Sequence, residues 1–173
     1  PPLVDDFSNP NLEGRRASRG DWTMKDGIAK VTQDDALYAK YKNHGPIIFY
    51  DVDHKDAVIE FSYKPEGVKS FVFTVNGADG HVFRTVSSER GTDFRAFPPG
   101  DDHKSISLHR LEKPMVEGEW TPMKIELRGA KATVTVGDNE PVTVEHASLD
   151  RAKVNTSVGF SFGTLSVKGF SVR

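Results

Sequence analysis

The sequence contains no cysteine, which excludes disulfide bonds and thiolate metal sites. It also lacks long apolar runs, since no stretch approaches the roughly 18 to 20 apolar residues that a membrane-spanning helix needs. An excess of one charge sign is missing as well, because 23 basic and 25 acidic residues give a formal net charge of −2. We therefore expect no membrane insertion and no nucleic-acid partner.

The length and the first residues of the chain set two further expectations. At 173 residues the chain has the size of one domain with its own core, and we expect residues 1–173 to form a single domain. The first six residues have neither the basic nor the apolar region of a signal peptide. Any export signal would therefore have been removed ahead of residue 1.

Apolar residues recur at every second position along most of the chain, which is the pattern of β-strands with one buried face. Turn signals separate these segments at intervals of roughly 8 to 12 residues, as in β-sandwiches and barrels. We predict an all-β fold, a two-sheet antiparallel jelly-roll sandwich. The residues expected in its core are Ile59, Phe61, Phe71, Phe73, Ile125, Leu127, Val134, Phe160 and Phe162.

Several local signals indicate how the strands are connected. Residues 76–80 tolerate the positive φ of a tight turn, which predicts a hairpin into a strand over residues 81–86. Near the end of the chain, Lys168 and Gly169 interrupt the alternation by one position, which indicates a β-bulge. Only residues 147–153 look helical, with Ser148 as the expected N-cap.

Residues 87–104 break the alternation and are polar and rich in turn-forming residues. We expect most of this stretch to form a long loop outside the sheets. Loops of this length within a small domain are often binding loops, although they also occur as mobile insertions.

Candidate ligand-binding residues lie in and beside that loop: His81, Arg84, Asp102 and His103. A loop that returns to the sheet near Lys104 would carry Asp102 and His103 back over the hairpin, so we expect all four side chains to converge on one cleft. Imidazole and guanidinium groups hydrogen-bond sugar hydroxyls and carboxylates. The alternative is that these are ordinary polar residues on a solvated sheet.

Carboxylates are the candidates for catalysis, because hydrolysis of a glycosidic bond normally uses two of them. Glu60 is on the polar face of its strand, and we expect it on the floor of the same cleft. Glu89 and Asp93 in the predicted loop are the other candidates. The sequence singles out no pair among its 25 acidic residues.

No metal or other cofactor is expected. Asp101, Asp102 and His103 are adjacent, so they match neither the alternating acidic spacing of a calcium loop nor the spacing of a helical zinc pair. Asp5 and Asp6 could contribute to a structural calcium site, but an acidic pair at the start of a chain is usually solvated.

Short motifs follow one another in order along most of the chain. They are Gly20, Asp21 and Trp22 followed by Asp26, Gly27 and Ile28; residues 80–84; residues 102–105; residues 118–120 leading into 123–127; and the closing segments 158–160 and 170–172. In this order they resemble the concanavalin A-like lectin/glucanase superfamily, in particular the 3-keto-disaccharide hydrolase-like domains of exported bacterial proteins.

That resemblance implies a carbohydrate-associated domain, either glycan-binding or glycoside-hydrolase-like, of an exported or periplasmic bacterial protein. The Gly-rich strand and the Glu-Gln-Asp segment of hydrolase members are not recognisable here, since residues 70–76 read Ser, Phe, Val, Phe, Thr, Val, Asn. The absence of these motifs counts against catalysis. The resemblance still makes a carbohydrate the expected partner. The competing class is a non-catalytic structural or protein-interaction sandwich, which the same fold serves equally well.

Overall fold

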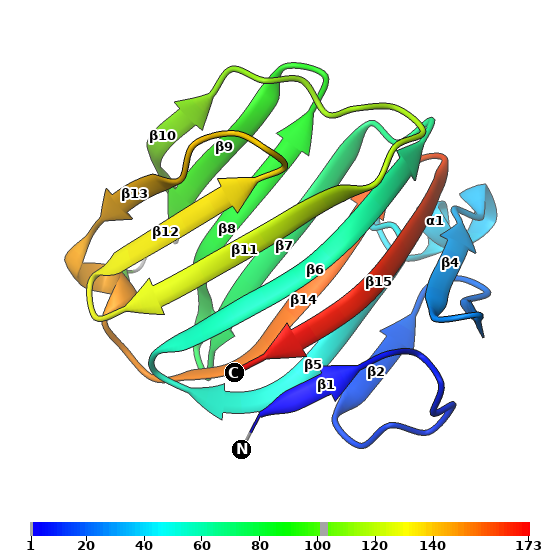
Figure 1. Cartoon of the computed structure of the whole chain (residues 1–173), viewed down its shortest axis with the longest axis horizontal. Helices are drawn as coiled ribbons and strands as arrows, with labels where there is room; N and C mark the ends of the chain where they lie inside the picture. Colours follow the sequence, from blue (N-terminus) through cyan, green and yellow to red (C-terminus); the bar gives the residue numbers. More distant parts are fainter. Residues whose placement is uncertain (1, 101–103) are drawn as a thin grey trace.

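Two antiparallel β-sheets pack face to face in the computed structural model, which describes residues 2–100 and 104–173 (Figure 1). We call them sheet A and sheet B, and sheet A lies in front of sheet B in the view of Figure 1. Both sheets combine pairs of consecutive strands with pairs of strands that are distant in the sequence. The predicted two-sheet antiparallel jelly-roll sandwich is confirmed.

Sheet A has the strand order β13-β12-β11-β6-β15-β4-β3, with β1 paired to β15. Because the last strand, β15, pairs with the first, β1, the two ends of the described chain are joined in one sheet. On its other side β15 pairs with β6. The strands are β1 (Leu3–Asp5), β3 (Thr23–Lys25), β4 (Ile28–Thr32), β6 (Ala57–Glu66), β11 (Thr121–Arg128), β12 (Lys131–Val136), β13 (Val142–Glu145) and β15 (Thr164–Val172).

Sheet B has the strand order β10-β9-β8-β7-β14-β5-β2. Its central strands β7 and β14 pair in a regular antiparallel register that runs from Asn76 opposite Asn155 to Ser70 opposite Ser161. The strands are β2 (Arg15–Ser18), β5 (Ile47–His54), β7 (Ser70–Gly77), β8 (Gly80–Ser88), β9 (Gly91–Ala96), β10 (Ile106–Leu111) and β14 (Lys153–Ser161).

The predicted connections are confirmed at two places. Strands β7 and β8 form a hairpin that closes with Gly77 opposite Gly80. The register of β15 against β6 shifts between Lys168 and Ser171, which is the bulge that the broken alternation indicated.

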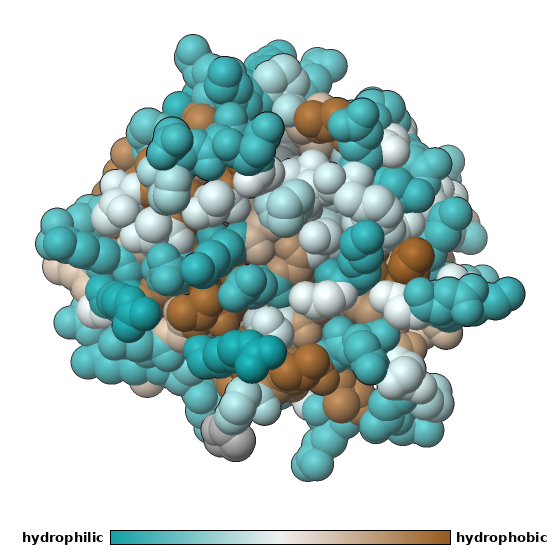
Figure 2. All heavy atoms as spheres, in the orientation of Figure 1, coloured by the Kyte–Doolittle hydropathy of each residue, from teal (hydrophilic) through white to brown (hydrophobic). Residues whose placement is uncertain are grey.

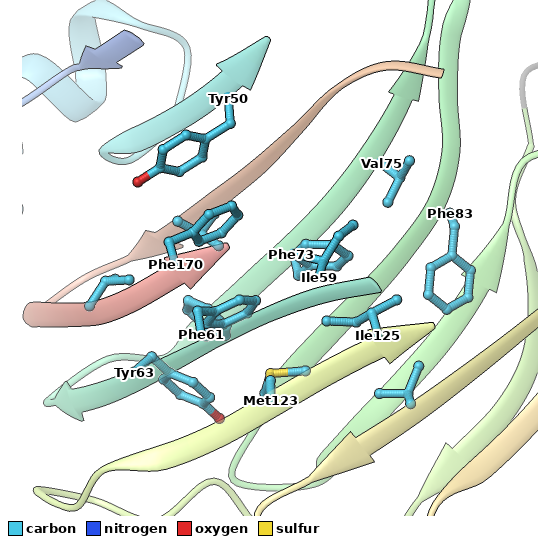
Figure 3. Close-up of a cluster of buried hydrophobic side chains, with 14 of the residues drawn as sticks. Tyr50, Ile59, Phe61, Tyr63, Phe73, Val75, Phe83, Met123, Ile125 and Phe170 are labelled. Atoms are coloured by element: carbon cyan, nitrogen blue, oxygen red, sulfur yellow. The ribbon is translucent and has the colours of Figure 1, made fainter. Parts of the chain in front are cut away.

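Aromatic side chains from both sheets fill the space between them (Figure 3). Phe61 of sheet A lies at the centre, with its ring centroid 5.5 Å from that of Phe170, 5.7 Å from Phe73 and 5.9 Å from Phe71. Tyr50 of sheet B stacks on Phe170 at 4.0 Å. Rings of one sheet thus contact rings of the other, so each sheet depends on the other for its buried surface.

The residues expected in the core are buried, with the exception of Phe162. Phe162 is half-buried, has a φ of 68° in the turn after β14, and its ring lies 5.1 Å from that of Tyr38. The alternation of Val158 and Phe160 continues to Phe162 in the sequence, but the strand ends at Ser161. The core prediction for Phe162 was therefore wrong.

Two short helical segments connect strands. The sequence pattern missed α1 (Asp35–Lys40), because this helix buries none of its residues and has no apolar stripe. Asp34 caps α1 by accepting hydrogen bonds from two backbone N–H groups of its first turn. The helical stretch predicted near Ser148 is a single 3-10 turn, Ala147–Leu149, and its N-cap is His146. No helix in residues 2–100 and 104–173 is long and apolar enough to cross a membrane.

Strand β9 occupies part of the stretch 87–104 that was predicted to be a loop, and that prediction was wrong for Gly91–Ala96. Phe94 is buried between the sheets. Asp93 and Arg95 alternate with it on the outer face and form an ion pair. The polar residues thus belong to a strand with one apolar face. The alternation of this strand is hard to recognise in the sequence because only one of its inward side chains is large.

Asp5 is buried, contrary to the expectation that it is solvated. Its carboxylate accepts hydrogen bonds from the Tyr50 hydroxyl at 2.8 Å and from Arg15 Nη1 at 2.9 and 3.0 Å. It also accepts one from the backbone N–H of Phe7 at 2.8 Å. Burial, and then the Asp5 charge, raise the pKa of Tyr50, which keeps this hydroxyl protonated as a donor. This cluster ties β1 and β2 to the core.

Candidate functional site

A cleft of about 310 Å³ opens on the outer face of sheet B, and we call it the sheet B cleft. It crosses four strands, β5, β14, β7 and β8, and it ends against the loop between α1 and β5. A volume of this size is at the lower end of small-molecule sites. Its lining residues are Arg19, Asn43, His44, Gly45, Pro46, Ile47, Phe49, Val72, Thr74, Asn76, His81, Arg84, Ser157, Gly159, Phe160 and Ser161.

The hollow arises because the central strand β14 presents small residues on its outer face. Ser157, Gly159 and Ser161 lie between the larger side chains of β5 and β7. One wall approaches closely, since a Cβ on Gly45 would lie 2.0 Å from the carbonyl oxygen of Phe160. A glycine at position 45 therefore lets the loop pack directly against β14 and close that end of the cleft.

A chain of hydrogen bonds fixes the polar side chains at the other end of the cleft. Asn76 Nδ2 donates to Asn155 Oδ1 at 2.8 Å, and Asn76 Oδ1 lies 2.6 Å from His81 Nδ1. Arg84 Nη2 donates to His81 Nε2 at 3.1 Å, while Arg84 Nε donates to Thr74 Oγ1 at 3.0 Å. Because each of these side chains is hydrogen-bonded to its neighbour, the site is preorganised before any ligand binds.

These contacts assign the protonation of His81. A guanidinium only donates hydrogen bonds, so His81 Nε2 accepts from Arg84 and Nδ1 carries the proton that is donated to Asn76 Oδ1. Burial, and then the charge of Arg84, lower the pKa of His81. The imidazole is therefore neutral at neutral pH.

A bulge in β8 places His81 and Arg84 on the same face of the sheet. Residues three positions apart on a regular strand point to opposite faces. The register between β7 and β8 shifts here, since Val75 lies opposite Phe83 while Asn76 lies opposite His81. Val82 is the extra residue, and it restores the two polar side chains to one side.

Phe97 and Arg151 complete this end of the site. The Phe97 ring lies edge-on to the His81 ring at 5.1 Å, and the Arg84 guanidinium lies 5.4 Å from the Phe97 centroid. Arg151 Nη2 donates to the carbonyl oxygens of His81 at 2.9 Å and Phe97 at 2.8 Å. Arg151 thus fastens the segment after β9 to the start of β8.

The structure brings His81 and Arg84 together, and it does not bring Glu60 to them. Glu60 lies in β6 of sheet A, where it lines a separate hollow of about 500 Å³. The expectation that Glu60 forms the floor of the cleft was wrong, because the polar face of β6 is the outer face of the other sheet. Asp102 and His103 lie outside the described residues, and their place in the cleft stays a prediction.

The two remaining carboxylate candidates are also separate from the cleft. Glu89 is in the turn between β8 and β9 and lines a hollow at the edge of the sandwich. Asp93 is on the outer face of β9, where Ser107 Oγ donates to it and Arg95 pairs with it. Burial alone would raise the pKa of Asp93, but these hydrogen bonds and the charge of Arg95 outweigh it and lower the pKa. Asp93 is thus poorly suited to act as a general acid.

The outer face of sheet A offers a different surface. Hydrophilic and neutral side chains cover most of the face over β6, β11, β12 and β15, and its apolar patches are separated (Figure 2). Trp120 lies on this side of the molecule, where Lys168 Nζ is 4.1 Å and Lys64 Nζ is 5.4 Å from its ring. Two ammonium groups thus already make cation–π contacts with the Trp120 ring.

Sequence reasoning missed several residues of the cleft, including Asn76, Thr74 and Phe49. The signal was present, because Ile48 and Tyr50 point inward and period two therefore places Phe49 outside. Asn76 and Thr74 alternate in the same way with the inward residues of β7. The pattern gives the face of each residue but not which strands are neighbours.

A pH dependence of stability follows from the lowered pKa of His81. The unfolded chain binds a proton at this histidine around its ordinary value of 6.5, whereas the folded protein binds it only at lower pH. The free energy of unfolding is therefore expected to fall as the pH drops below about 6.5. Burial lowers the pKa of His54 too, which adds a fall of the same sign.

Urea unfolding between about pH 7.5 and 5.5 measures this effect. His81→Gln is expected to lose stability less steeply than the wild type over this range, while His54 contributes equally to both. Parallel slopes for the two proteins would contradict a lowered pKa at His81.

No family model matches the sequence, and no curated protein matches it. Solved structures do resemble it. Carbohydrate-binding module CBM66 from Bacillus subtilis aligns with a TM-score of 0.67 and 11% identity over 94% of this chain and 98% of its own. A sialidase aligns with a TM-score of 0.69 and 10% identity over 99% of this chain and 18% of its own. Congerin II liganded with lactose and MES aligns with a TM-score of 0.59 and 10% identity over 71% of this chain and 96% of its own. At these identities the similarity establishes a shared lectin-like β-sandwich fold.

Proposed function

We propose that this chain is a carbohydrate-binding domain that takes a glycan in the sheet B cleft. The observation that carries the proposal is the cleft itself, a hollow of about 310 Å³ with small residues in its centre. The hydrogen-bonding groups at one end of it are preorganised. Sugar hydroxyls need donors and acceptors at fixed positions, and the bonds among Asn76, His81 and Arg84 provide them.

Aromatic side chains beside the polar groups support a sugar ligand. Phe97 lies against His81 and Arg84, and Phe49 lines the other side of the cleft. An apolar ring next to hydrogen-bonding groups matches a sugar, which has apolar C–H faces and polar edges. The similar structures named as carbohydrate-binding support the same proposal.

Binding is favoured over hydrolysis because none of the residues that line the described cleft is an aspartate or glutamate. Glycoside hydrolysis normally needs two carboxylates on either side of the scissile bond. The finer resemblance, to 3-keto-disaccharide hydrolase-like domains, remains the alternative within the same fold. Incubation with keto- and ordinary disaccharides tests it, and product release that depends on Glu60, Glu89 or Asp93 would favour hydrolysis.

The proposal takes residues 1–173 as one domain and places it in an exported or periplasmic protein. Strands from both ends of the chain share sheet A, which supports one domain. The location rests on the sequence resemblance alone.

Filling the cleft tests the proposal. Ser157→Phe puts a large ring into the centre of the hollow, where Ser157 is 3% exposed, so it is expected to weaken binding of the best glycan in an array by at least about tenfold. Thr133→Phe, on the outer face of β12 in sheet A, is the matched control and is expected to bind as the wild type does. Isothermal titration measures both variants, and circular dichroism checks that they fold.

Two outcomes would contradict the proposal. A wild-type protein that binds no glycan would favour a structural or protein-interaction role. Equal affinity in Ser157→Phe and the wild type would place any glycan site elsewhere on the surface.

A further inference from the structure

We propose that the glycan of the sheet B cleft is anionic, with a carboxylate or a sulfate ester on its sugars, and that Arg84 pairs with that charge. This inference rests on the proposed function, because it names the class of sugar that the same cleft takes. It starts from Arg84, whose side chain donates hydrogen bonds to those of Thr74 and His81.

Arg84 is a partly buried guanidinium that has no carboxylate partner among the described residues. None of the ion pairs formed within residues 2–100 and 104–173 involves it. Arg95, which lies directly opposite Arg84 on β9, shows the contrast, because it pairs with Asp93. Burying a charge costs free energy unless an opposite charge compensates it. Burial alone lowers the pKa of Arg84, consistent with this lack of compensation.

The geometry of Arg84 leaves its binding edge open. Of the five N–H groups of a guanidinium, one on Nε goes to Thr74 and one on Nη2 goes to His81. No hydrogen bond from the described part of the chain engages the two N–H groups of Nη1 or the second one of Nη2. One N–H of Nη1 and the second one of Nη2 can together form the end-on fork that binds two oxygens of a carboxylate or sulfate group. The contacts to Thr74, His81 and Phe97 fix the plane of this fork.

The charge of the whole cleft agrees with an anion. Its lining includes two guanidinium groups, those of Arg19 and Arg84, and it includes no aspartate or glutamate among the described residues. No carboxylate within residues 2–100 and 104–173 pairs with either guanidinium group, and an anionic glycan would supply that charge.

Two pairs of polymers that differ in charge test the inference at physiological ionic strength. Polygalacturonate is compared with its methyl ester, and dextran sulfate with dextran; alginate and hyaluronan add two carboxylate polymers. The wild type is expected to bind at least one of the charged polymers about 10- to 100-fold more tightly than its neutral counterpart. Which pair shows the difference distinguishes carboxylate from sulfate.

Arg84→Gln is expected to lose about 10- to 100-fold in affinity for that charged polymer. The matched control is Arg128→Gln, which removes the same charge from an exposed residue at the end of β11 in sheet A and is expected to bind as the wild type does. Arg84→Lys keeps the charge but loses the fork, and is expected to bind more weakly than the wild type. It serves as the test if Arg84→Gln does not fold.

The outcomes separate this inference from the proposed function. Binding of neutral glycans only, blocked by Ser157→Phe, would overturn the inference and leave the proposed function intact. Binding of charged polymers that Arg84→Gln and Arg128→Gln reduce equally would also overturn it, since the attraction would then be nonspecific. No binding of any polymer or array glycan would overturn both.

Discussion

Replacing Asp5 by alanine is expected to lower the free energy of unfolding by about 3 to 5 kcal/mol, because it leaves a buried cation without its partner. The side chains of Arg15 and Asp5 are 4% and 1% exposed, and their closest atoms are 2.9 Å apart. The Tyr50 hydroxyl loses its acceptor as well. For a chain of this length the melting temperature is expected to fall by about 6 to 20 °C.

Asp51→Ala is the matched control for this prediction. Asp51 pairs with Arg16 at 2.8 Å, but the two side chains are 44% and 54% exposed. Exposed ion pairs contribute about 0 to 1 kcal/mol, so the control is expected to unfold close to the wild type. Equal urea midpoints for Asp5→Ala and Asp51→Ala would show that the buried cluster does not stabilise the sandwich.

Phe61→Ala is expected to cost about 3 to 5 kcal/mol of unfolding free energy, because it leaves a cavity at the centre of the core. The Phe61 ring contacts those of Phe71, Phe73 and Phe170, so the change affects both sheets. Phe162→Ala removes the same atoms from the half-buried turn after β14, and is expected to cost less than about 1 kcal/mol.

Urea unfolding monitored by circular dichroism measures both phenylalanine variants. A loss at Phe162 as large as that at Phe61 would mean that the turn is part of the core, as the alternation first suggested. The comparison therefore tests the correction that the structure makes to the sequence pattern.

The sequence predicted the sandwich well because period two is a local property of each strand. Ile59 and Phe61 reveal the inward face of β6 without any knowledge of its neighbours. The same rule failed where a strand ends, because Phe162 continues the alternation of Val158 and Phe160 after the chain has left the sheet. Local periodicity thus gives the faces of strands better than their ends.

The candidate site was predicted only in part because its geometry depends on long-range pairing. His81 and Arg84 share a face because of the extra residue Val82, which appears only when β8 is aligned with β7. Glu60 was assigned to the same cleft because a polar strand face does not show which sheet it belongs to. Asn76 and Ser157 belong to the cleft only because β7 and β14 are neighbours.

The most direct test of the glycan site is an NMR titration of the labelled protein with the glycan that binds best in the array. We expect the largest amide shift changes at the sheet B cleft, at Thr74, Asn76, His81 and Gly159. Amides of the sheet A hollow, such as those of Lys124 and Thr135, are expected to stay in place. Shift changes that gather on sheet A instead, or that are absent at saturating glycan, would contradict a binding site in the sheet B cleft.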